Sequence, residues 1–556
     1  MLSYKRKELV ASLSFVLAFV LAFSVLIAAN SVTRELPEDA VSPEDQVLKI
    51  QSSFGGTYMD IMKTMYNRHG TPIIIQEPLT RFDRDFNVKP AGADSWEVSD
   101  DGLTWTFHLD PDLKWSDGKD IAADDYLYAL KRALRQGYDF GWYYSFAAGI
   151  KNWNAVSKGE KEMDELGVEV AGPETLKVTT SEPKPYLPGV FSWWMPVPKH
   201  VVEEHGDEYA TKADTLVASG PFMVTEWIKG QKIVYEPNPH YGGEWKPYLK
   251  KIIEVGGTSE AETSFPAYMG DDLDVSSLNP GQLRYARKAI PDQLHSWPSW
   301  QIFYLSLNTN VQPFDDPKVR KALALAIDRE QLTSTALEDL ANPLTTILMP
   351  GYPGHHESLT DELKFNPEKA QQLLAEAGYP DGEGFPKLDL YVRDESVIMH
   401  IQKPLAQYIQ NQFKKNLGIN INIKIVQMKT WVDYLYNLKK KFFMSPYAKD
   451  YFDPSNFLGL FTSSGREPYN NEKYNDLVNE ANRTFDQEKR QKLYKQAEEL
   501  FLEEVPAVPL VQKVTHKVWK PYLSGEGVEA NSDGVKRWGA GVKAYNFTHT
   551  YIAEKE

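Results

Sequence analysis

Cysteine is absent from this chain of 556 residues. Its absence excludes disulfide bonds, thiolate metal sites, iron–sulfur clusters and a cysteine nucleophile. A long basic run is also missing, and the net charge is -16. Because binding to a phosphate backbone requires clustered lysine and arginine, both features argue against nucleic acid as a partner. No GxSxG, HExxH or P-loop motif occurs, so the signatures of the corresponding enzymes are missing too.

Long uncharged runs are scarce, and the prominent one lies at the N-terminus. It spans Leu9 to Ala29 and follows three basic residues at positions 5–7, an order typical of an export signal. Its 21 residues are also enough to span a bilayer, so residues 9–29 are either a cleaved signal or an uncleaved anchor. We assign residues 1–30 to this segment and the polar stretch 31–45 to a linker. We therefore expect a periplasmic or cell-surface location.

The composition is typical of a folded protein with several domains. Aromatic residues make up 12% of the chain and apolar residues 42%, which is typical of a globular rather than a disordered protein. A chain of this length is too long for one hydrophobic core, so we expect two or three domains.

The segment Ser95 to Leu134 predicts a strand followed by a helix. Apolar residues alternate with polar ones from Leu103 to Leu109, as in a strand with one buried face. After a turn, apolar residues between Tyr126 and Leu134 recur at i, i+3, i+4, i+7 and i+8, the stripe of an amphipathic helix. Asp124 and Asp125 stand where the positive end of that helix is expected.

From about residue 300 to 520, helix and strand patterns alternate. Asp316-Pro317 and Asn366-Pro367 each place an N-cap residue before a proline at the first helical position. Strands are expected at Leu388 to Val392 and at 419–425, where isoleucine alternates with polar residues. This alternation predicts an α/β domain with a mixed sheet.

Five blocks of sequence occur in an order that is characteristic of one protein family. They read SWEVSDDGLTWTFHLDPDLKWSDGKDIAADDYLYALKRAL, then ASGPFMVTEW with NPHYGG, then YLSLNTNVQPFDDPKVRKALALAID, then FNPEKAQQLLAEAGYP, and finally YAKDYFDPSNF. Together they resemble the family 5 extracellular solute-binding proteins, the oligopeptide- and dipeptide-binding receptors of ABC importers. The resemblance covers the chain from about residue 46 to 520.

The resemblance implies an α/β fold of the periplasmic-binding-protein-like class II, with two lobes plus an additional inserted domain (cluster C type). Lobe I would be discontinuous and formed by residues 46–87, 205–298 and 520–556. The inserted domain II would span 88–204, and lobe III would span 299–519. Two crossing segments would form a hinge, with the ligand between the lobes.

Asp450 is the ligand-binding candidate that the resemblance singles out. In the oligopeptide receptors that this sequence resembles, the acidic residue matching Asp450, in the pair with Tyr451, meets the α-ammonium group of the peptide. Charge-assisted hydrogen bonds of this kind contribute roughly 1.5 to 3 kcal/mol each, although Asp450 could instead cap a turn. Met444 and Tyr447 stand where such receptors often carry arginine and tryptophan, which leaves room for another amine or a sugar. We include Tyr447 and Tyr451 among the candidate contacts.

Tyr143, Tyr144 and Asn308 complete the set of candidate contacts. The two tyrosines belong to an aromatic cluster that in the family faces the ligand from domain II, although such a cluster could also be core. The segment 304–308 and the stretch just before Asp450 could pair with a peptide main chain as an added strand. We assign the tryptophans at 193–194 to packing.

The leading interpretation is an exported binding protein that closes on an oligopeptide or related small solute and delivers it to an ABC permease. Closure needs no covalent step, so we predict no enzymatic activity, catalytic residue, cofactor or metal, and we expect a monomer. One alternative is an oligosaccharide receptor of the same architecture. The other is an extracytoplasmic hydrolase, whose paired carboxylates could come from distant positions.

Overall fold

The computed structural model describes residues 32–52, 58–63, 72–135, 138, 140–436, 442–467, 469–539 and 542–555. The predicted export signal or anchor at 9–29 lies outside these residues. Among the residues described, no helix combines the length and apolar character needed to cross a membrane.

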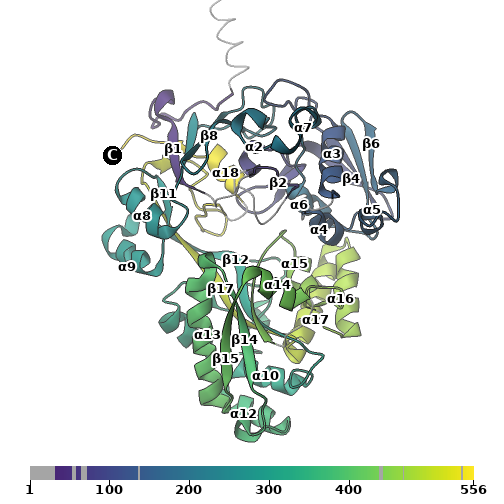
Figure 1. The fold of residues 1–556 in the computed structure, drawn as a ribbon, viewed down its shortest axis with the longest axis vertical. Coiled ribbons are helices and arrows are strands. Elements are labelled where there is room, and N and C mark those ends of the chain that lie inside the picture. Colours follow the sequence, from purple (N-terminus) through teal and green to yellow (C-terminus); the bar gives the residue numbers. More distant parts are fainter. Residues whose placement is uncertain are drawn as a thin grey trace, which may run out of the picture.

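An eleven-stranded mixed sheet extends through an upper and a lower lobe (Figure 1). Its strands are β1 (Val47–Gln51), β8 (Phe222–Ile228), β9 (Lys232–Pro237), β10 (Lys251–Val255), β11 (Val275–Ser277), β12 (Leu294–Leu307), β13 (Ala341–Pro343), β14 (Leu388–Asp394), β15 (Ile421–Gln427), β16 (Phe442–Ala448) and β17 (Ala507–Trp519). Their order is β15-β14-β16-β12-β17-β11-β1-β10-β9-β8, with β13 paired to β17.

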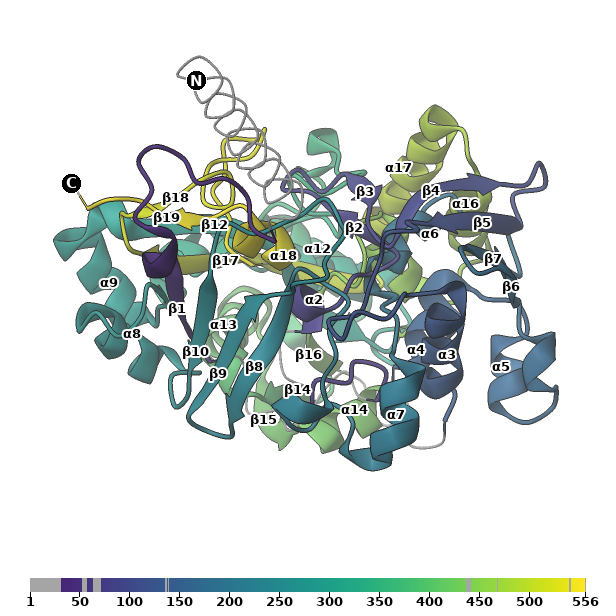
Figure 2. The ribbon, with the colours of Figure 1, turned by 90° about the horizontal axis from the view of Figure 1, so that it is seen from above.

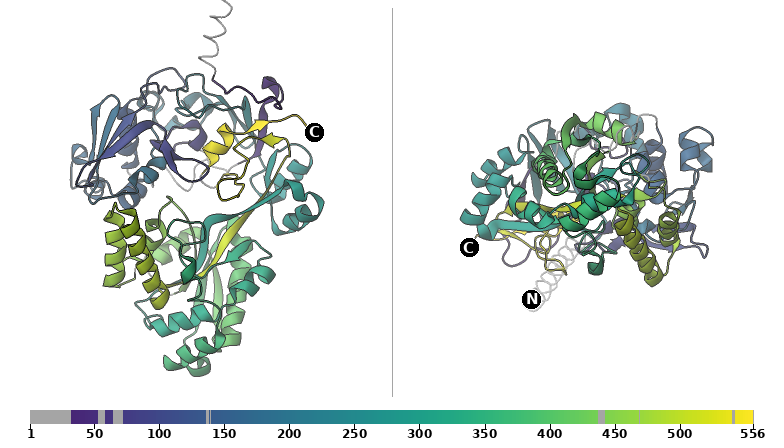
Figure 3. Two further views of the ribbon diagram at one scale, coloured as in Figure 1. Left: turned by 180° about the vertical axis from the view of Figure 1, so that it is seen from behind. Right: turned by 90° about the horizontal axis from the view of Figure 1, so that it is seen from below.

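Strands β12 and β17 connect the two lobes. Near Lys517, β17 pairs with β11 of the upper lobe, and at its other end it pairs with the part of β12 that also pairs with β16 in the lower lobe. Figure 3 shows both strands passing from one lobe to the other. The two crossing segments expected between the lobes are therefore these antiparallel strands.

A second, four-stranded sheet with the order β4-β5-β7-β6 forms a side domain next to the upper lobe. Figure 2 shows it at the end of the upper lobe opposite β1. Its elements are β4 (Ala93–Val98), β5 (Thr104–Leu109), α3 (Ala123–Ala133), α4 (Gly141–Tyr143), α5 (Trp153–Ser157), β6 (Val168–Gly172), β7 (Thr175–Thr179), α6 (Leu187–Val190) and α7 (Lys199–His205). The strand and helix predicted between residues 95 and 134 are confirmed as β5 and α3.

The upper lobe is completed by short helices and two small strand pairs. These are α2 (Pro72–Ile75), α8 (Ala261–Met269), α9 (Pro280–Ala289), α18 (Lys543–Thr548), β2 (Thr80–Phe82) with β3 (Val88–Pro90), and β18 (Leu523–Ser524) with β19 (Tyr551–Ile552). The C-terminal segment therefore returns to the upper lobe (Figure 1).

The lower lobe has the capped helices that the sequence predicts. Asp316 accepts a hydrogen bond from the Lys318 amide at 2.8 Å, and Asn366 accepts one from the Lys369 amide at 3.0 Å. The helices are α10 (Pro317–Leu325), α11 (Arg329–Gln331), α12 (Pro367–Glu376), α13 (Ser396–Leu417), α14 (Met428–Tyr436), α15 (Ser455–Leu458), α16 (Glu472–Arg483) and α17 (Gln487–Glu504).

The predicted α/β class with a mixed sheet is confirmed, because β14 runs parallel to β15 while β12 runs antiparallel to β16 and β17. One detail of the strand prediction differs. Ile425 is 48% exposed, although the alternation predicts a buried isoleucine there, and it lies near the end of β15, which is the edge strand of the sheet. The four-stranded sheet falls within residues 88–204, while the exact domain boundaries remain a prediction.

Candidate ligand-binding site

A cavity of about 960 Å³ lies between the lobes, beside the crossing strands. The beginnings of α8 and α9 contribute its upper wall, and His400 of α13 contributes from below. Part of its wall is aromatic, with Trp297 and Trp300 from β12 and Trp193 from the side domain. A space of this size suits a ligand of several residues.

An interruption of the β12 ladder shapes the cavity wall. The pairing of β12 with β17 shifts register between Pro298 and Ile302, and Ser299, Trp300 and Gln301 in the shifted stretch all line the cavity. The Trp300 carbonyl accepts a hydrogen bond from the Lys449 amide at 2.9 Å. The irregular part of β12 thus fixes the position of Lys449, which follows β16 and lines the cavity.

Asp450 lies at the junction of the side domain and the lower lobe. Its carboxylate accepts a hydrogen bond from the Tyr447 hydroxyl at 2.6 Å, and its amide donates to the Asn456 side chain at 2.9 Å. Burial raises the pKa of Asp450 above its ordinary value, while the bonds from Tyr447 and Asn456 and the charge of Arg466 act the other way. Asp450 does not itself line the cavity, but its neighbour Lys449 does.

Arg466 is a cation near Asp450 that the sequence analysis did not identify. Its guanidinium lies over the Tyr447 ring, 4.8 Å from the centroid, and contacts Tyr304 and Glu467. Met444, at the position where the receptors that the sequence resembles often carry an arginine, is fully buried in β16. Arg466, 22 positions after Met444, therefore lies near Tyr447 and Asp450 from a different loop. No local sequence pattern indicates this arrangement.

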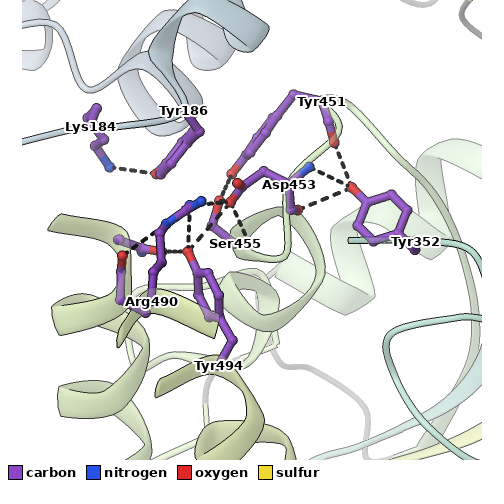
Figure 4. Close-up of polar contacts among 10 residues, drawn as sticks. Lys184, Tyr186, Tyr352, Tyr451, Asp453, Ser455, Arg490 and Tyr494 are labelled. Carbon is purple, nitrogen blue, oxygen red and sulfur yellow. Dashed lines mark hydrogen bonds and ion pairs between the residues drawn. The ribbon is translucent and has the colours of Figure 1, made fainter. Parts of the chain in front are cut away.

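Tyr451 connects the lower lobe to the side domain. Its ring stacks on Tyr186 with centroids 5.5 Å apart, and the Arg490 guanidinium lies 5.2 Å from the Tyr186 centroid. Figure 4 shows Tyr186 facing this group of lower-lobe residues, in which Arg490 pairs with Asp453 at 2.7 Å. Tyr451 thus packs between domains and is 3% exposed.

The structure places Tyr143 and Tyr144 behind the cavity wall. Both are buried; Tyr143 donates a hydrogen bond to the Val190 carbonyl at 2.9 Å, and Tyr144 donates one to the Trp193 carbonyl at 3.3 Å. Neither is among the described residues that line the cavity. They support the segment that carries Trp193, and any direct contact with ligand remains a prediction.

Trp193 has a larger role than the packing we assigned to it. It lines the cavity and donates its indole N–H to the Asp450 carbonyl oxygen at 3.1 Å. Trp194 does pack: it is fully buried and donates to the Tyr126 carbonyl at 3.0 Å. Adjacent tryptophans in one short segment give no sequence signal that distinguishes these two roles.

The segment 304–308 cannot offer a free strand edge as expected. Tyr304 to Leu307 pair with β16 on one side, and Tyr304 to Ser306 pair with β17 on the other, so a peptide finds no open ladder there. Asn308 follows β12 at its lower end, where its side chain accepts a hydrogen bond from the Asn310 amide at 3.2 Å. The stretch before Asp450 differs, because Ala448 is exposed and lines the cavity.

No group of three or more histidine, aspartate or glutamate side chains in the described part of the chain could hold a metal ion. The cavity lining includes lysines, the indoles of tryptophans, and serine, asparagine and glutamine side chains that can donate or accept hydrogen bonds. Such a set can bind and orient a polar ligand.

Comparison with known proteins agrees with this architecture. The family model for bacterial extracellular solute-binding proteins, family 5 (middle), matches residues 87–469. The probable deoxycholate-binding periplasmic protein YgiS of Escherichia coli is 28% identical, covering 90% of this chain and 94% of its own. The dipeptide-binding protein DppE of Bacillus subtilis is 30% identical, covering 78% and 81%.

Solved structures agree with the sequence comparison. The unliganded open form of the periplasmic murein tripeptide-binding protein MppA superposes with a TM-score of 0.76 at 25% identity, covering 93% of this chain and 99% of that one. The predicted periplasmic-binding-protein-like fold is therefore confirmed. Because the family model matches more than half of the sequence, the chain belongs to the family 5 bacterial extracellular solute-binding proteins.

Proposed function

We propose that the protein is an exported receptor that captures oligopeptides between its lobes and delivers them to an ABC permease. The cavity between the lobes supports this proposal, as do relatives named for binding dipeptides and a murein tripeptide. Capture and release of a peptide require no bond to be broken, so the proposed role is that of a binding protein rather than an enzyme. We expect this receptor to act as a monomer.

The observation that carries the proposal is the position of Asp450. Asp450 lies at the junction between the side domain and the lower lobe, where its backbone carbonyl accepts a hydrogen bond from the cavity residue Trp193, and its neighbour Lys449 lines the cavity. A carboxylate can accept more hydrogen bonds than the one from the Tyr447 hydroxyl. The α-ammonium group of a peptide supplies such donors, and lobe closure would bring it to Asp450 in a dry environment.

We expect the peptide main chain to bind between two strand ends that line the cavity. Ala448 ends β16 and lines the cavity together with Gln51, the last residue of β1. A peptide between these two strand ends can form main-chain hydrogen bonds to both lobes, while its side chains occupy the aromatic space. Binding of this kind tolerates varied sequences.

Isothermal titration calorimetry of the full chain with trialanine tests the proposal. We expect binding, and a loss of at least about tenfold in affinity for Asp450→Asn, equivalent to roughly 1.4 kcal/mol. N-acetyl-trialanine should bind the wild type more weakly and should be insensitive to the substitution. Chromatography after the titration should recover the peptide intact.

Two non-peptide ligands test the alternatives to peptide binding. Maltotriose tests the oligosaccharide alternative, and deoxycholate tests the ligand named for one relative. Binding of either compound without binding of any peptide would contradict the proposed function. Cleavage of trialanine would show the protein to be a hydrolase.

A further inference from the structure

Lysine side chains line the cavity from several directions. Lys513 and Lys517 lie on the crossing strand β17, Lys543 begins α18, and Lys449 follows β16. All four are half-buried. We call these four residues the lysine wall.

The acidic residues of the cavity lie elsewhere. Glu260 and Glu262 line it at the start of α8, and both are exposed. One of them is already engaged, because Glu262 accepts a hydrogen bond from Asn279 at 3.1 Å. In a protein with a net charge of -16, the inner surface of this cavity is therefore locally cationic.

Three of the lysines are close enough to repel one another. Lys513 and Lys517 are four residues apart on one face of β17, about 13 Å along an extended strand. Burial, together with the charges of Lys543 and Lys513, lowers the pKa of Lys517 to about 8. Like charges held together in a partly dry site destabilise the empty receptor, and a bound anion relieves this repulsion.

Three lysines of the wall have no carboxylate within ion-pair distance in the described part of the chain. Lys449, Lys513 and Lys517 form no ion pair with a carboxylate of the described residues, whereas Lys520, three positions after Lys517, pairs with Asp271. Lys449 instead lies over two aromatic rings, 5.8 Å from the Phe82 centroid. Three lysines around one cavity, none of them in an ion pair with a carboxylate of the described residues, favour negative charge in the ligand.

We propose that the lysine wall selects peptides with acidic side chains over neutral or basic ones. This inference rests on the proposed peptide-binding function and adds the substrate class. The C-terminal carboxylate of a peptide can pair with one lysine of the wall. The other lysines can pair only with further carboxylates, which aspartate or glutamate side chains of the peptide would supply. Trp297 and Trp300 line the same cavity, and an ion pair is stronger in such partly apolar surroundings than in water.

Calorimetric titration of the full chain with three matched peptides tests the proposal. Ala-Glu-Glu, Ala-Gln-Gln and Ala-Lys-Lys have side chains of similar length and differ in charge. We expect Ala-Glu-Glu to bind about tenfold more tightly than Ala-Gln-Gln and Ala-Lys-Lys to bind most weakly, with the differences decreasing as salt is added. The measured quantity is the ratio of the dissociation constants for Ala-Gln-Gln and Ala-Glu-Glu.

Variants of the lysine wall identify the source of that ratio. In the double variant Lys513→Gln with Lys517→Gln, we expect the ratio to fall to about two. The charge-conserving pair Lys513→Arg with Lys517→Arg should keep most of it. Lys158→Gln removes an exposed lysine of the side domain and should leave the ratio at its wild-type value.

Two outcomes overturn the inference. The first is equal binding of Ala-Glu-Glu and Ala-Gln-Gln by the wild type, and the second is an unchanged ratio in the double glutamine variant that still binds Ala-Gln-Gln. Both leave the proposed function intact, because peptides still bind. Failure of all three peptides, together with trialanine, would instead contradict the function itself.

Discussion

Trp193 of the side domain donates its indole N–H to the backbone carbonyl of Asp450 in the lower lobe, at 3.1 Å. The residues are 257 positions apart in the chain. Within the side domain, the Trp193 carbonyl in turn accepts a hydrogen bond from the Tyr144 hydroxyl. The contact therefore connects the candidate ammonium site to the side domain.

Replacing Trp193 with phenylalanine keeps most of the ring and removes the N–H. We expect the affinity for trialanine to fall about fivefold, because one hydrogen bond contributes about 1 kcal/mol. Calorimetry measures this change. Trp96→Phe in β4 is the matched control, and an equal loss in both variants would show that Trp193 acts only through general packing.

The pair Arg490 and Asp453 should matter for stability, because both side chains are buried. Arg490→Met leaves the Asp453 carboxylate without its cation, and we expect the free energy of unfolding of the lower lobe to fall by about 3 kcal/mol. Urea denaturation monitored by circular dichroism measures it. Adding Asp453→Asn should restore part of the loss.

Arg483 provides the contrast to that buried pair. It contacts Glu182 of the side domain at 3.0 Å on the surface, where both side chains are nearly half exposed. Arg483→Met should therefore change the stability little, because water and salt screen the pair. A loss as large as that of Arg490→Met would contradict this assignment.

Glu498 should make stability depend on pH. Burial raises the pKa of Glu498 to about 8, although its carboxylate accepts hydrogen bonds from the Ile347 and Leu348 amides at 3.0 and 2.9 Å. Between about pH 4.5 and 8 the folded state holds a proton that the unfolded state has lost, so stability decreases as pH rises through this range. Urea denaturation at a series of pH values checks the sign.

Glu498→Gln should remove that decrease, since an amide does not titrate. The exposed neighbour Glu499 is the control, and Glu499→Gln should keep the wild-type slope. If Glu498→Gln left the slope of unfolding free energy against pH unchanged, the pH dependence would come from another group.

The lysine wall also predicts a pH-dependent preference. Burial lowers the pKa of Lys449 to about 8, with Asp450 opposing the shift, and Lys517 has a similar value beside Lys513 and Lys543. As pH rises from 7 to 9, both lose their protons, so the Ala-Gln-Gln to Ala-Glu-Glu ratio of dissociation constants should fall. The ratio cancels the titration of the peptide amine, which is common to both ligands. A ratio that stays constant to pH 9 would contradict a role for these two charges.

The regular elements could be predicted from the sequence because their signals are local. Asp316 and Asn366 sit at helix starts as their spacing before proline indicates, and the alternation around Phe107 becomes β5. Ile425 shows the limit, since the position of β15 at the sheet edge depends on strand order. Strand order is set by contacts that no local pattern contains.

The candidate site could be predicted only in part. The resemblance singles out Asp450, and the structure places it at the lobe junction. Trp193, Arg466 and the lysine wall come from separate segments, and each looks like an ordinary packing or surface residue in its own sequence context. Tertiary folding brings Trp193 and the four lysines to one cavity beside β12 and β17, and it places Arg466 against Tyr447.

Native mass spectrometry of the protein purified from its producing cells tests the central claim most directly. After denaturation, the released ligand is identified by fragmentation. The account predicts intact peptides with free amino termini, enriched in aspartate and glutamate. Release of a carbohydrate or a steroid in place of peptides would contradict it.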